Sequence, residues 1–377
     1  MIQCFHYSTI QPHWKRPRID RGCQKRYDRF GVVYPLPAFS ECIQSKEDKR
    51  LMKLLIALPC YNEAEKIQEV LASIPRSYEG IDQVRLLVVD DGSADETTRL
   101  AHEAGATVIR HKQNKGLGHA FRSAVDFAID HGYDIMVNMD GDGQFDSNDI
   151  ARLIQPILNN EADFVTASRF LKDQKIEHMP PIKKWGNAQM NRLISTLCGQ
   201  KFSDVSCGFR AYSRETLLKI NFHGRFTYTQ ESFISFHFHN LAIREVPIDV
   251  TYFPERKSRI AGSILKYLKK TLGIIMGLMR DYYPLRFFGF IGGVFMIPAV
   301  IFGLMFLMHY IRVGYFSGYL FAGLICAFCT LVSVLMFSFG LAMESMVRIN
   351  RNENRILYHV RKNAPVTPDE EGAILYQ

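Results

Sequence analysis

Short apolar runs alternate with amphipathic, helix-patterned stretches along the chain after residue 52. The runs cover residues 54–58, 85–89, 107–110, 133–139 and 163–167. Continuous apolar runs are typical of strands buried on both faces, and strands that alternate with helices form parallel sheets. A later run, residues 245–250, contains a proline and therefore predicts an edge strand, because proline donates no ladder hydrogen bond. The pattern predicts an α/β domain with a mostly parallel sheet over residues 53–262.

The pattern changes after residue 262. Residues 287–308 and 313–343 carry no charged side chain, and each is long enough to cross a bilayer core of roughly 30 Å as a helix. We therefore predict a hairpin of two transmembrane helices over residues 287–343. Residues 263–286 mix apolar positions with lysines, which is typical of an amphipathic helix lying in the membrane interface. An ordinary core helix is the alternative for that segment.

Basic side chains flank the two apolar stretches. Five precede the first stretch and three follow the second, whereas the short connection holds only Arg312; the flanking residues are Lys266, Lys269, Lys270, Arg280, Arg286, Arg348, Arg351 and Arg355. The positive-inside rule then places the α/β domain and both termini in the cytoplasm, as in a multi-pass protein of the inner (cytoplasmic) membrane. Residues 344–377 are predicted to be a cytoplasmic tail that is polar and mobile after Arg355.

The formal net charge of the chain is +8, and much of it lies at the N-terminal end. Residues 1–52 show no hydrophobic period and are predicted to be a disordered basic extension. A basic protein can bind nucleic acid, but here the remaining basic residues gather beside the membrane stretches, which disfavours that function. The eight cysteines form no CxxC motif and are predicted to be reduced thiols.

The run over residues 133–139 ends in two carboxylates, Asp140 and Asp142. Ligands of open α/β sheets bind beyond the carboxyl ends of the strands, so both side chains are expected at the rim of the sheet. Two adjacent carboxylates repel each other unless a cation shares them, and Mg²⁺ or Mn²⁺ prefers such oxygen ligands. Gln144 can add an amide oxygen. A solvated acidic turn is the alternative interpretation of the same residues.

Polar motifs also follow the strands at residues 54–58 and 85–89, namely Pro59-Cys60-Tyr61-Asn62-Glu63 and Asp90-Asp91-Gly92-Ser93. The carboxyl ends of parallel strands meet at one edge of a sheet, so these motifs are expected beside the acidic pair. A chance set of acidic loops would not follow strand polarity in this way. The sequence therefore predicts one composite site at that rim.

Five motifs in this order resemble those of family 2 glycosyltransferases, and most closely the polyprenyl-phosphate sugar transferases of the dolichyl-phosphate mannose synthase group. They are Pro59-x-Tyr61-Asn62-Glu63, Asp90-Asp91-Gly92-Ser93, Asn114-x-Gly116-x-Gly118, Asp140-x-Asp142-x-Gln144 and Ser168-Arg169. The resemblance covers about residues 53–262. It implies a GT-A fold and a nucleotide-diphosphate sugar as the donor.

The resemblance also implies roles for individual residues. The nucleotide pocket would comprise Pro59, Tyr61, Glu63, Val88 and Asp90, with Asp91 in support. Asp140, Gly141 and Asp142 would bind the diphosphate and the metal, with Gln144 as a further metal ligand.

Arginines complete the implied site. Arg169 and Arg259 would bind the donor phosphates, and Arg210 would lie in a loop on the acceptor side; with Asp142 these are the predicted catalytic residues. The chain departs from the family where the pattern Arg-x-x-Gly-x-Ser-Lys is common, because its lysine is displaced to Lys266.

These features predict a membrane-anchored, metal-dependent, inverting transferase that moves a sugar to polyprenyl (undecaprenyl or dolichyl) phosphate. A lipid phosphate is already ionised and needs no general base. A family 2 transferase acting on a glycan or glycolipid hydroxyl remains an alternative, with Asp204 and Glu231 as candidate bases. A silent scaffold that only binds nucleotide sugar is a second alternative, which the intact pair of Asp140 and Asp142 disfavours. Membrane lipid is an expected partner, and a homo-oligomer stays open.

Overall fold

The structure is a computed structural model that describes residues 25–27, 33–35, 51–171, 181–221, 228–248, 250, 273, 276–277, 279–315, 317–369 and 372–377. The chain divides into two units, Met1–Arg50 and Leu51–Gln377. In the first unit, β1 (Lys25–Tyr27) and β2 (Val33–Pro35) pair in antiparallel fashion. All that follows concerns the second unit.

The second unit is built on an eight-stranded mixed sheet with the order β10-β5-β4-β3-β6-β8-β7-β9. Its strands are β3 (Lys53–Cys60), β4 (Gln83–Asp90), β5 (Thr107–Arg110), β6 (Ile135–Asn138), β7 (Phe164–Ser168), β8 (Arg210–Ser213), β9 (Ile243–Pro247) and β10 (Ile374–Tyr376). Only β8 runs antiparallel to its neighbours, β6 and β7. The chain leaves β3 toward β4 on one side and reaches β6 on the other, so a topological switch point lies at β3, where such sheets bind ligands.

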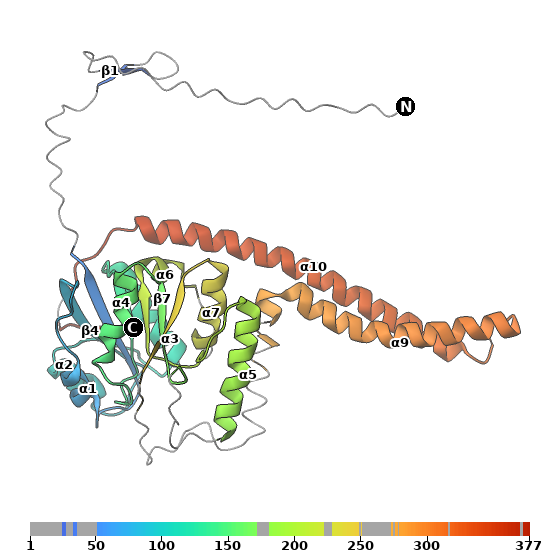
Figure 1. Ribbon diagram of the computed structural model, residues 1–377, viewed down its shortest axis with the longest axis horizontal. Coiled ribbons are helices and arrows are strands. Elements are labelled where there is room, and N and C mark those ends of the chain that lie inside the picture. Colours follow the sequence, from blue (N-terminus) through green and yellow to red (C-terminus); the bar gives the residue numbers. More distant parts are fainter. Residues whose placement is uncertain are drawn as a thin grey trace. The chain divides into compact units, whose positions relative to one another are not determined.

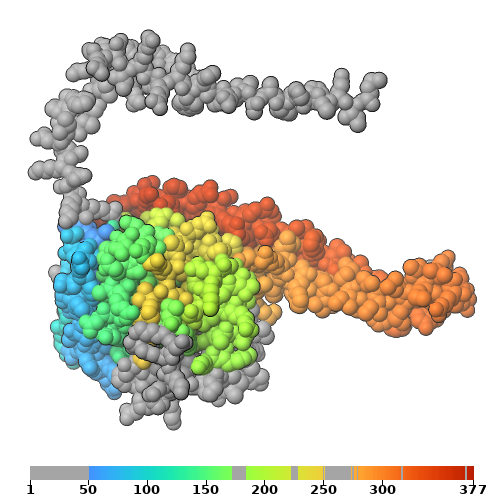
Figure 2. Space-filling view, in the orientation of Figure 1, coloured from blue at the N-terminus to red at the C-terminus, as the bar shows by residue number. Residues whose placement is uncertain are grey.

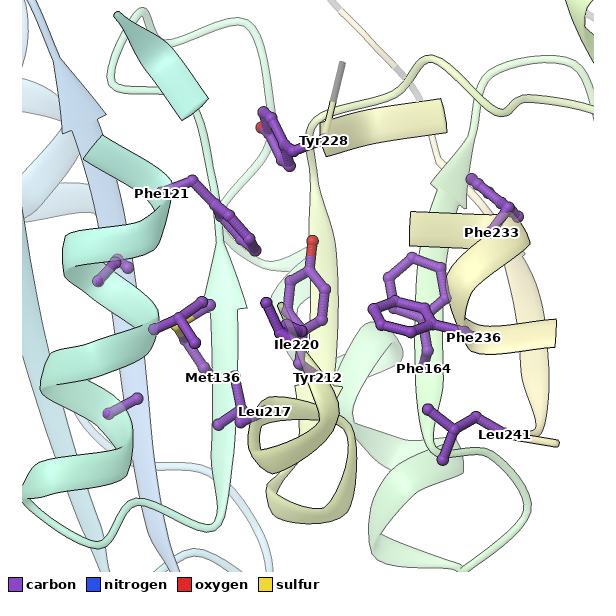
Figure 3. Packing of buried hydrophobic residues seen from close by; sticks show 14 of the residues in the cluster. Phe121, Met136, Phe164, Tyr212, Leu217, Ile220, Tyr228, Phe233, Phe236 and Leu241 are labelled. Carbon is purple, nitrogen blue, oxygen red and sulfur yellow. The ribbon is translucent and has the colours of Figure 1, made fainter. Parts of the chain in front are cut away.

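Helices cover both faces of the sheet because every buried strand sends alternate side chains to opposite sides. On one face, Leu55, Met136 and Tyr212 pack with α3 (Leu117–Asp130), α5 (Pro181–Cys198), α6 (Arg214–Lys219) and α7 (Tyr228–Phe238), as the cluster in Figure 3 shows in part. On the other face, Leu54 and Val137 pack with α1 (Ile67–Ser73), α2 (Thr97–Glu103) and α4 (Asp149–Leu158). The result is a three-layer α/β sandwich.

The strands predicted from the five apolar runs are all present. The predicted edge strand is also confirmed as β9, although it begins and ends earlier than expected. Pro247 takes part in the sheet only beside Ser168 of β7, its one strand neighbour, which is where a residue without an N–H can be tolerated.

Two long helices follow the domain, α9 (Pro284–Val313) and α10 (Leu320–Asn363), and they lie side by side in Figure 1. Both are long and apolar enough to cross a membrane, and only 11% and 17% of their most apolar windows are buried. A core helix of a soluble protein would be mostly buried, whereas Phe290, Ile311 and Leu324 are more than 70% exposed. In Figure 2 the orange and red surfaces of this pair extend beyond the sheet domain.

Close approach of the two helices depends on glycine. A Cβ atom at Gly292 of α9 would lie 3.1 Å from the Ser333 carbonyl oxygen of α10, and a Cβ at Gly340 of α10 would lie 3.3 Å from Leu285 and Phe288. Small residues at such contacts are typical of helix pairs in membranes. The predicted interfacial segment lies mostly outside the described residues; the part described, including residues 279–282, is helical.

The prediction of a mobile tail after Arg355 is wrong. Helix α10 continues to Asn363, and its second half packs on the sheet domain: Tyr358 donates a 3.0 Å hydrogen bond to Glu215, and Arg351 lies 4.8 Å from the centre of the Phe238 ring. The chain then returns to the sheet and ends in strand β10.

Candidate functional site

The loops after β3, β4 and β6 meet at the switch point of the sheet, as predicted. Cys60, the last residue of β3, is affected by residues of all three loops. Burial raises the pKa of its thiol, and the charges of four carboxylates raise it further: Glu63, Asp90, Asp140 and Asp142. These four residues come from three separate loops. The rim therefore concentrates negative charge around one buried sulfur atom, which carries none itself.

Asp90 closes β4 and is completely buried. One carboxylate oxygen accepts hydrogen bonds from the backbone N–H of Ser93, at 2.9 Å, and from its hydroxyl, while the other accepts from the Thr98 hydroxyl. Ser93 in turn accepts a 2.9 Å hydrogen bond from the backbone N–H of Asn62. Asp90 therefore ties its own loop to the loop that follows β3, and both of its oxygens are engaged in doing so.

Asn62 adopts a left-handed conformation, with φ of 56°. Its side-chain oxygen accepts a 3.0 Å hydrogen bond from the backbone N–H of Ala94, which completes the link between the two loops. Asparagine tolerates positive φ better than most residues, so the residue type fits both the turn and the contact. Tyr61 and Glu63, on either side of it, are partly exposed at the rim, as a nucleotide pocket would require.

Asp91 organises the next loop along the chain. It accepts hydrogen bonds from the backbone N–H groups of Lys115 (2.9 Å) and Gly116 (2.7 Å), just before α3 begins. The Nδ1 atom of His111 lies 2.8 Å from the same carboxylate. Both side chains are almost fully buried. Asp91 therefore holds the loop before α3, and its support of a nucleotide pocket stays a prediction. His111 was missed, since nothing in its local sequence distinguishes it.

Asp140 follows β6 and lies against Gly208, where a Cβ atom would come within 3.1 Å of a carboxylate oxygen. The Asn138 amide donates a 3.0 Å hydrogen bond to the Gly208 carbonyl and fixes that backbone in place. Burial, reinforced by Asp142, raises the pKa of Asp140 to about 6, although Arg169 and Arg210 act in the opposite direction. At neutral pH Asp140 is therefore ionised in surroundings that disfavour its negative charge.

The acidic pair fits a divalent cation. A cation would offset the repulsion that keeps the Asp140 pKa high, and Gln144 is close enough for its backbone N–H to donate a 3.1 Å hydrogen bond to Asp142. Within the described ranges, no three His, Cys, Asp or Glu side chains group as a metal site. Mg²⁺ is commonly held by one or two carboxylates together with substrate phosphates, so a pair is enough when the donor diphosphate supplies further oxygens.

Arg169 lies at the end of β7 and forms a two-pronged ion pair with Asp204. Its Nε donates to one carboxylate oxygen at 2.7 Å and an Nη donates to the other at 3.0 Å. Burial would raise the pKa of Asp204, but Arg169 outweighs that effect and holds the pKa below its usual value. Asp204 is therefore a poor general base, contrary to its candidacy for a hydroxyl acceptor. Arg169 is close enough to Asp140 to act on its pKa, which places it beside the acidic pair.

Arg210 does not lie in an acceptor loop, and this part of the prediction is wrong. It begins strand β8 and is fully buried. Its guanidinium donates to the carbonyls of Cys207 (2.7 Å) and Val205 (3.1 Å) and to the Ser232 hydroxyl (2.6 Å). It also lies 5.2–5.5 Å from the ring centres of two phenylalanines, Phe164 and Phe233. Arg210 holds the floor of the site together and has no surface with which to meet an acceptor.

Other predicted residues are placed as follows. Val88 is fully buried in the cluster beneath the rim, and Pro59 is a buried residue of β3, so neither presents a side chain to solvent. Gly141 packs against Cys60, where a Cβ atom would lie 2.5 Å from the sulfur, so no larger residue fits there. Arg259 lies outside the described residues, as does the displaced Lys266.

A groove of about 750 Å³ runs along α5. Its lining includes Phe170, Lys184, Arg192 and Lys201, and none of the predicted donor or metal residues.

Comparison with known proteins agrees with the geometry. Residues 55–220 match the family model described as glycosyl transferase family 2. The chain is 31% identical over 251 residues to the UDP-N-acetylglucosamine–dolichyl-phosphate N-acetylglucosaminyltransferase of Methanococcus voltae, over 60% of this chain and 98% of that protein. It is 29% identical over 227 residues to the undecaprenyl-phosphate mannosyltransferase of Micrococcus luteus, over 57% and 90% of the two chains.

Among solved structures, glucosyl-3-phosphoglycerate synthase from Mycobacterium tuberculosis, determined with Mn²⁺, uridine diphosphate and glucosyl-3-phosphoglycerate, aligns with a TM-score of 0.45. The sequence identity is 21%, and the match covers 60% of this chain and 80% of that one. The fold is that of a GT-A-like glycosyltransferase. The chain belongs to glycosyltransferase family 2.

Proposed function

We propose that the protein is a membrane-anchored, metal-dependent, inverting glycosyltransferase that moves a sugar from a nucleotide-diphosphate sugar to a polyprenyl phosphate. The names of the relatives from Methanococcus voltae and Micrococcus luteus support the lipid-phosphate acceptor. The observation that carries the proposal is the acidic pair at the rim of a domain that is packed onto the C-terminal part of α10, whose preceding part belongs to the apolar helix hairpin. The reaction centre and the membrane anchor thereby belong to one unit.

In the proposed reaction, a phosphate oxygen of the acceptor attacks the anomeric carbon of the sugar. The new carbon–oxygen bond forms as the bond to the nucleotide diphosphate breaks, so the configuration at that carbon inverts. A divalent cation held by Asp140 and Asp142 would neutralise charge on the departing diphosphate. Arg169, held in place by its ion pair with Asp204, would add a fixed positive charge beside the same phosphates.

No proton needs to be removed from an ionised phosphate, and the environment of Asp204 is consistent with such a reaction. Its ion pair with Arg169 keeps it ionised and engaged. We assign Arg169 and Asp142 as catalytic residues, and Glu63, Asp90 and Asp91 as residues that shape the donor pocket. Arg259 keeps its predicted phosphate-binding role as a proposal from the sequence alone.

Transfer to a hydroxyl is a second candidate, and Glu231 of α7 favours it. Burial raises the pKa of Glu231 to about 7, the range in which a carboxylate can act as a base near neutral pH. Its recorded contact is a 3.4 Å hydrogen bond from the Tyr282 hydroxyl, at the start of the membrane region. A phosphate acceptor would make that residue dispensable for the chemistry.

The orientation in the membrane is part of the proposal. The basic side chains beside the two long helices support a cytoplasmic sheet domain, with both termini on the same side. A reporter fused after Gln377 should be active only in the cytoplasm; activity on the opposite side of the membrane would reverse the topology.

The function is tested with the full chain purified in detergent and supplied with undecaprenyl phosphate. Radiolabelled UDP-N-acetylglucosamine, UDP-glucose and GDP-mannose are offered in turn, with Mg²⁺ or Mn²⁺ or with EDTA. We expect label from one donor in the organic phase only when the metal is present. The absence of a labelled lipid with every donor, or full transfer in EDTA, would refute the proposed activity or its metal dependence, respectively.

A further inference from the structure

The last residues of the chain reach the donor side of the site. The segment Ala364–Gln377, called the C-terminal strap here, leaves the end of α10 and returns to the sheet domain, where Figure 1 marks the C-terminus. Its described part covers residues 364–369 and 372–377. The backbone N–H and the hydroxyl of Thr367 both donate to the Asp130 carbonyl at the end of α3, at 2.8 and 3.1 Å.

A buried acidic group fastens the middle of the strap. The Asp369 carboxylate lies 3.4 Å from Arg85 of β4 and accepts a hydrogen bond from the Tyr133 hydroxyl. Its side chain is only 8% exposed. A carboxylate is rarely taken out of water without such partners, so this contact fixes where the strap crosses the domain.

The end of the strap completes the sheet. Strand β10 pairs in parallel with β5, with Ile374 beside Val108 and Tyr376 beside Arg110. The ladder extends to Gln377, whose N–H donates to the Arg110 carbonyl at 2.9 Å and whose carbonyl accepts from Lys112 at 3.0 Å. Without β10, β5 would be the exposed edge of the described sheet, and β5 leads directly into the loop that Asp91 holds.

A line of hydrogen bonds connects Gln377 to that loop. The Ser123 hydroxyl donates to the Gln377 side-chain oxygen at 3.1 Å, and Ser123 also lies 3.0 Å from Nε2 of His111. Nδ1 of the same histidine faces Asp91 at 2.8 Å, and Asp91 accepts from the backbone of Lys115 and Gly116. The Asp91 carboxylate can only accept, so Nδ1 of His111 carries the proton that faces it, and the other ring nitrogen faces the Ser123 hydroxyl.

The loop at the far end of this line lies over the second donor motif. A Cβ atom at Gly92, next to Asp91, would come within 2.6 Å of the Gln113 backbone, so the loop before α3 packs directly on the Asp90–Ser93 turn. A shift of residues 113–116 would therefore displace the turn that the hydrogen bonds of Asp90 hold in place. The strap therefore contacts the pocket indirectly, through the loop before α3.

We propose that the C-terminal strap positions the donor-binding loop, with Gln377, Ser123 and His111 as positioning residues that act through Asp91. The proposal rests on the proposed function, because it takes the rim at β3 and β4 to be the donor pocket. It assigns to the end of the chain a role in donor affinity, and it joins the membrane helix α10 to the pocket through the covalent chain.

The test uses full-length variants in detergent: Ser123→Ala and Gln377→Ala break the line, and Ser123→Thr retains the hydroxyl. Thr367→Val is the matched control, since it removes a strap hydrogen bond outside the line. Ile374→Lys is a second route, because a charge on this partly buried residue should dislodge β10. Two quantities are measured: amide hydrogen exchange at Lys115 and Gly116, and KM and kcat with the donor that the wild type uses among UDP-N-acetylglucosamine, UDP-glucose and GDP-mannose.

We expect exchange at Lys115 and Gly116 to rise about 2- to 10-fold in Ser123→Ala, Gln377→Ala and Ile374→Lys, the range expected for one lost hydrogen bond. The donor KM should rise by a similar factor while kcat stays within about twofold, and Ser123→Thr should restore both. Unchanged exchange and KM in the first two variants, or an equal change in Thr367→Val, would overturn the proposal. Hydrogen exchange is measured without substrate. If the wild type transfers no sugar, the proposed function is refuted, but the exchange rates still test whether the strap positions the loop.

Discussion

Replacing Asp140 by asparagine should stabilise the metal-free protein while it abolishes sugar transfer. Asparagine has nearly the shape of aspartate but no charge, so the packing against Gly208 is kept. The folded protein raises the pKa of Asp140 from 3.8 to about 6, chiefly by burial and by the neighbouring charge of Asp142. The ionised form is therefore less favourable in the folded state than in the unfolded chain, and the substitution removes that cost.

The size and the pH dependence follow from this shift. A change of roughly two pKa units corresponds to about 3 kcal/mol at 1.36 kcal/mol each, and partial solvent exposure of Asp140 reduces this to about 1–2 kcal/mol. Because the folded pKa is the higher one, the stability of the wild type is intact below pH 3.8 and falls as the pH rises through about 6. At pH 8 in EDTA, Asp140→Asn should therefore unfold roughly 2–6 °C above the wild type, and at pH 4 the two should coincide.

Thermal unfolding in detergent, followed by intrinsic fluorescence at pH 4 and pH 8, measures this difference. Added Mn²⁺ should raise the unfolding temperature of the wild type, since a ligand at 100 times its Kd contributes about 2.7 kcal/mol, and should have little effect on the variant. Destabilisation of Asp140→Asn at pH 8 in EDTA, or an equal response of both proteins to Mn²⁺, would refute the reasoning about the acidic pair.

Three further outcomes are expected. Asp142→Ala should abolish transfer with little change in unfolding temperature; full activity in the variant would remove Asp142 from the metal site. Asp204→Asn should destabilise the protein by roughly 2–4 kcal/mol, because it removes the negative charge that faces the largely buried Arg169; an unchanged midpoint in chemical denaturation would argue that the pair matters little. A chain starting at Met52 should fold and transfer sugar as the full chain does, and loss of most activity would make residues 1–51 part of the enzyme.

The strand pattern and the position of the acidic rim could be predicted from the sequence because both depend on local properties. A buried strand is a continuous apolar run, and the residues after it lie at the carboxyl edge of the sheet whatever else surrounds them. Asp90, Asp140 and Asp142 were therefore expected at one place, and the structure brings them together around Cys60.

Contacts between distant segments could not be predicted in this way. Arg210 looked like a loop residue because the phenylalanines that enclose it, Phe164 and Phe233, lie 46 residues before and 23 residues after it in the chain. Likewise, no sequence feature near Asp204 indicates that its ion-pair partner is Arg169, 35 residues away. A charged side chain can be classed as buried or exposed only once its neighbours are known.

The C-terminal strap shows the same limit in another form. The run Ile374-Leu375-Tyr376 is apolar, but three residues are too few to distinguish a strand from a coil by period alone. Its pairing with β5 depends on an edge created more than 250 residues earlier in the chain. His111 could not be singled out for the same reason, since its role comes from Asp91 on the neighbouring strand and Ser123 on α3.

The acceptor class is the central claim, and a matched pair of lipids tests it most directly. The purified full chain is given the labelled donor that it uses, with Mg²⁺ or Mn²⁺, and either undecaprenyl phosphate or undecaprenol, which differ only in the phosphate. The account predicts transfer to the phosphate and none to the alcohol, since no general base is needed for the first and Asp204 is unavailable for the second. Equal transfer to both lipids, or transfer to the alcohol that is lost in Glu231→Gln, would contradict it.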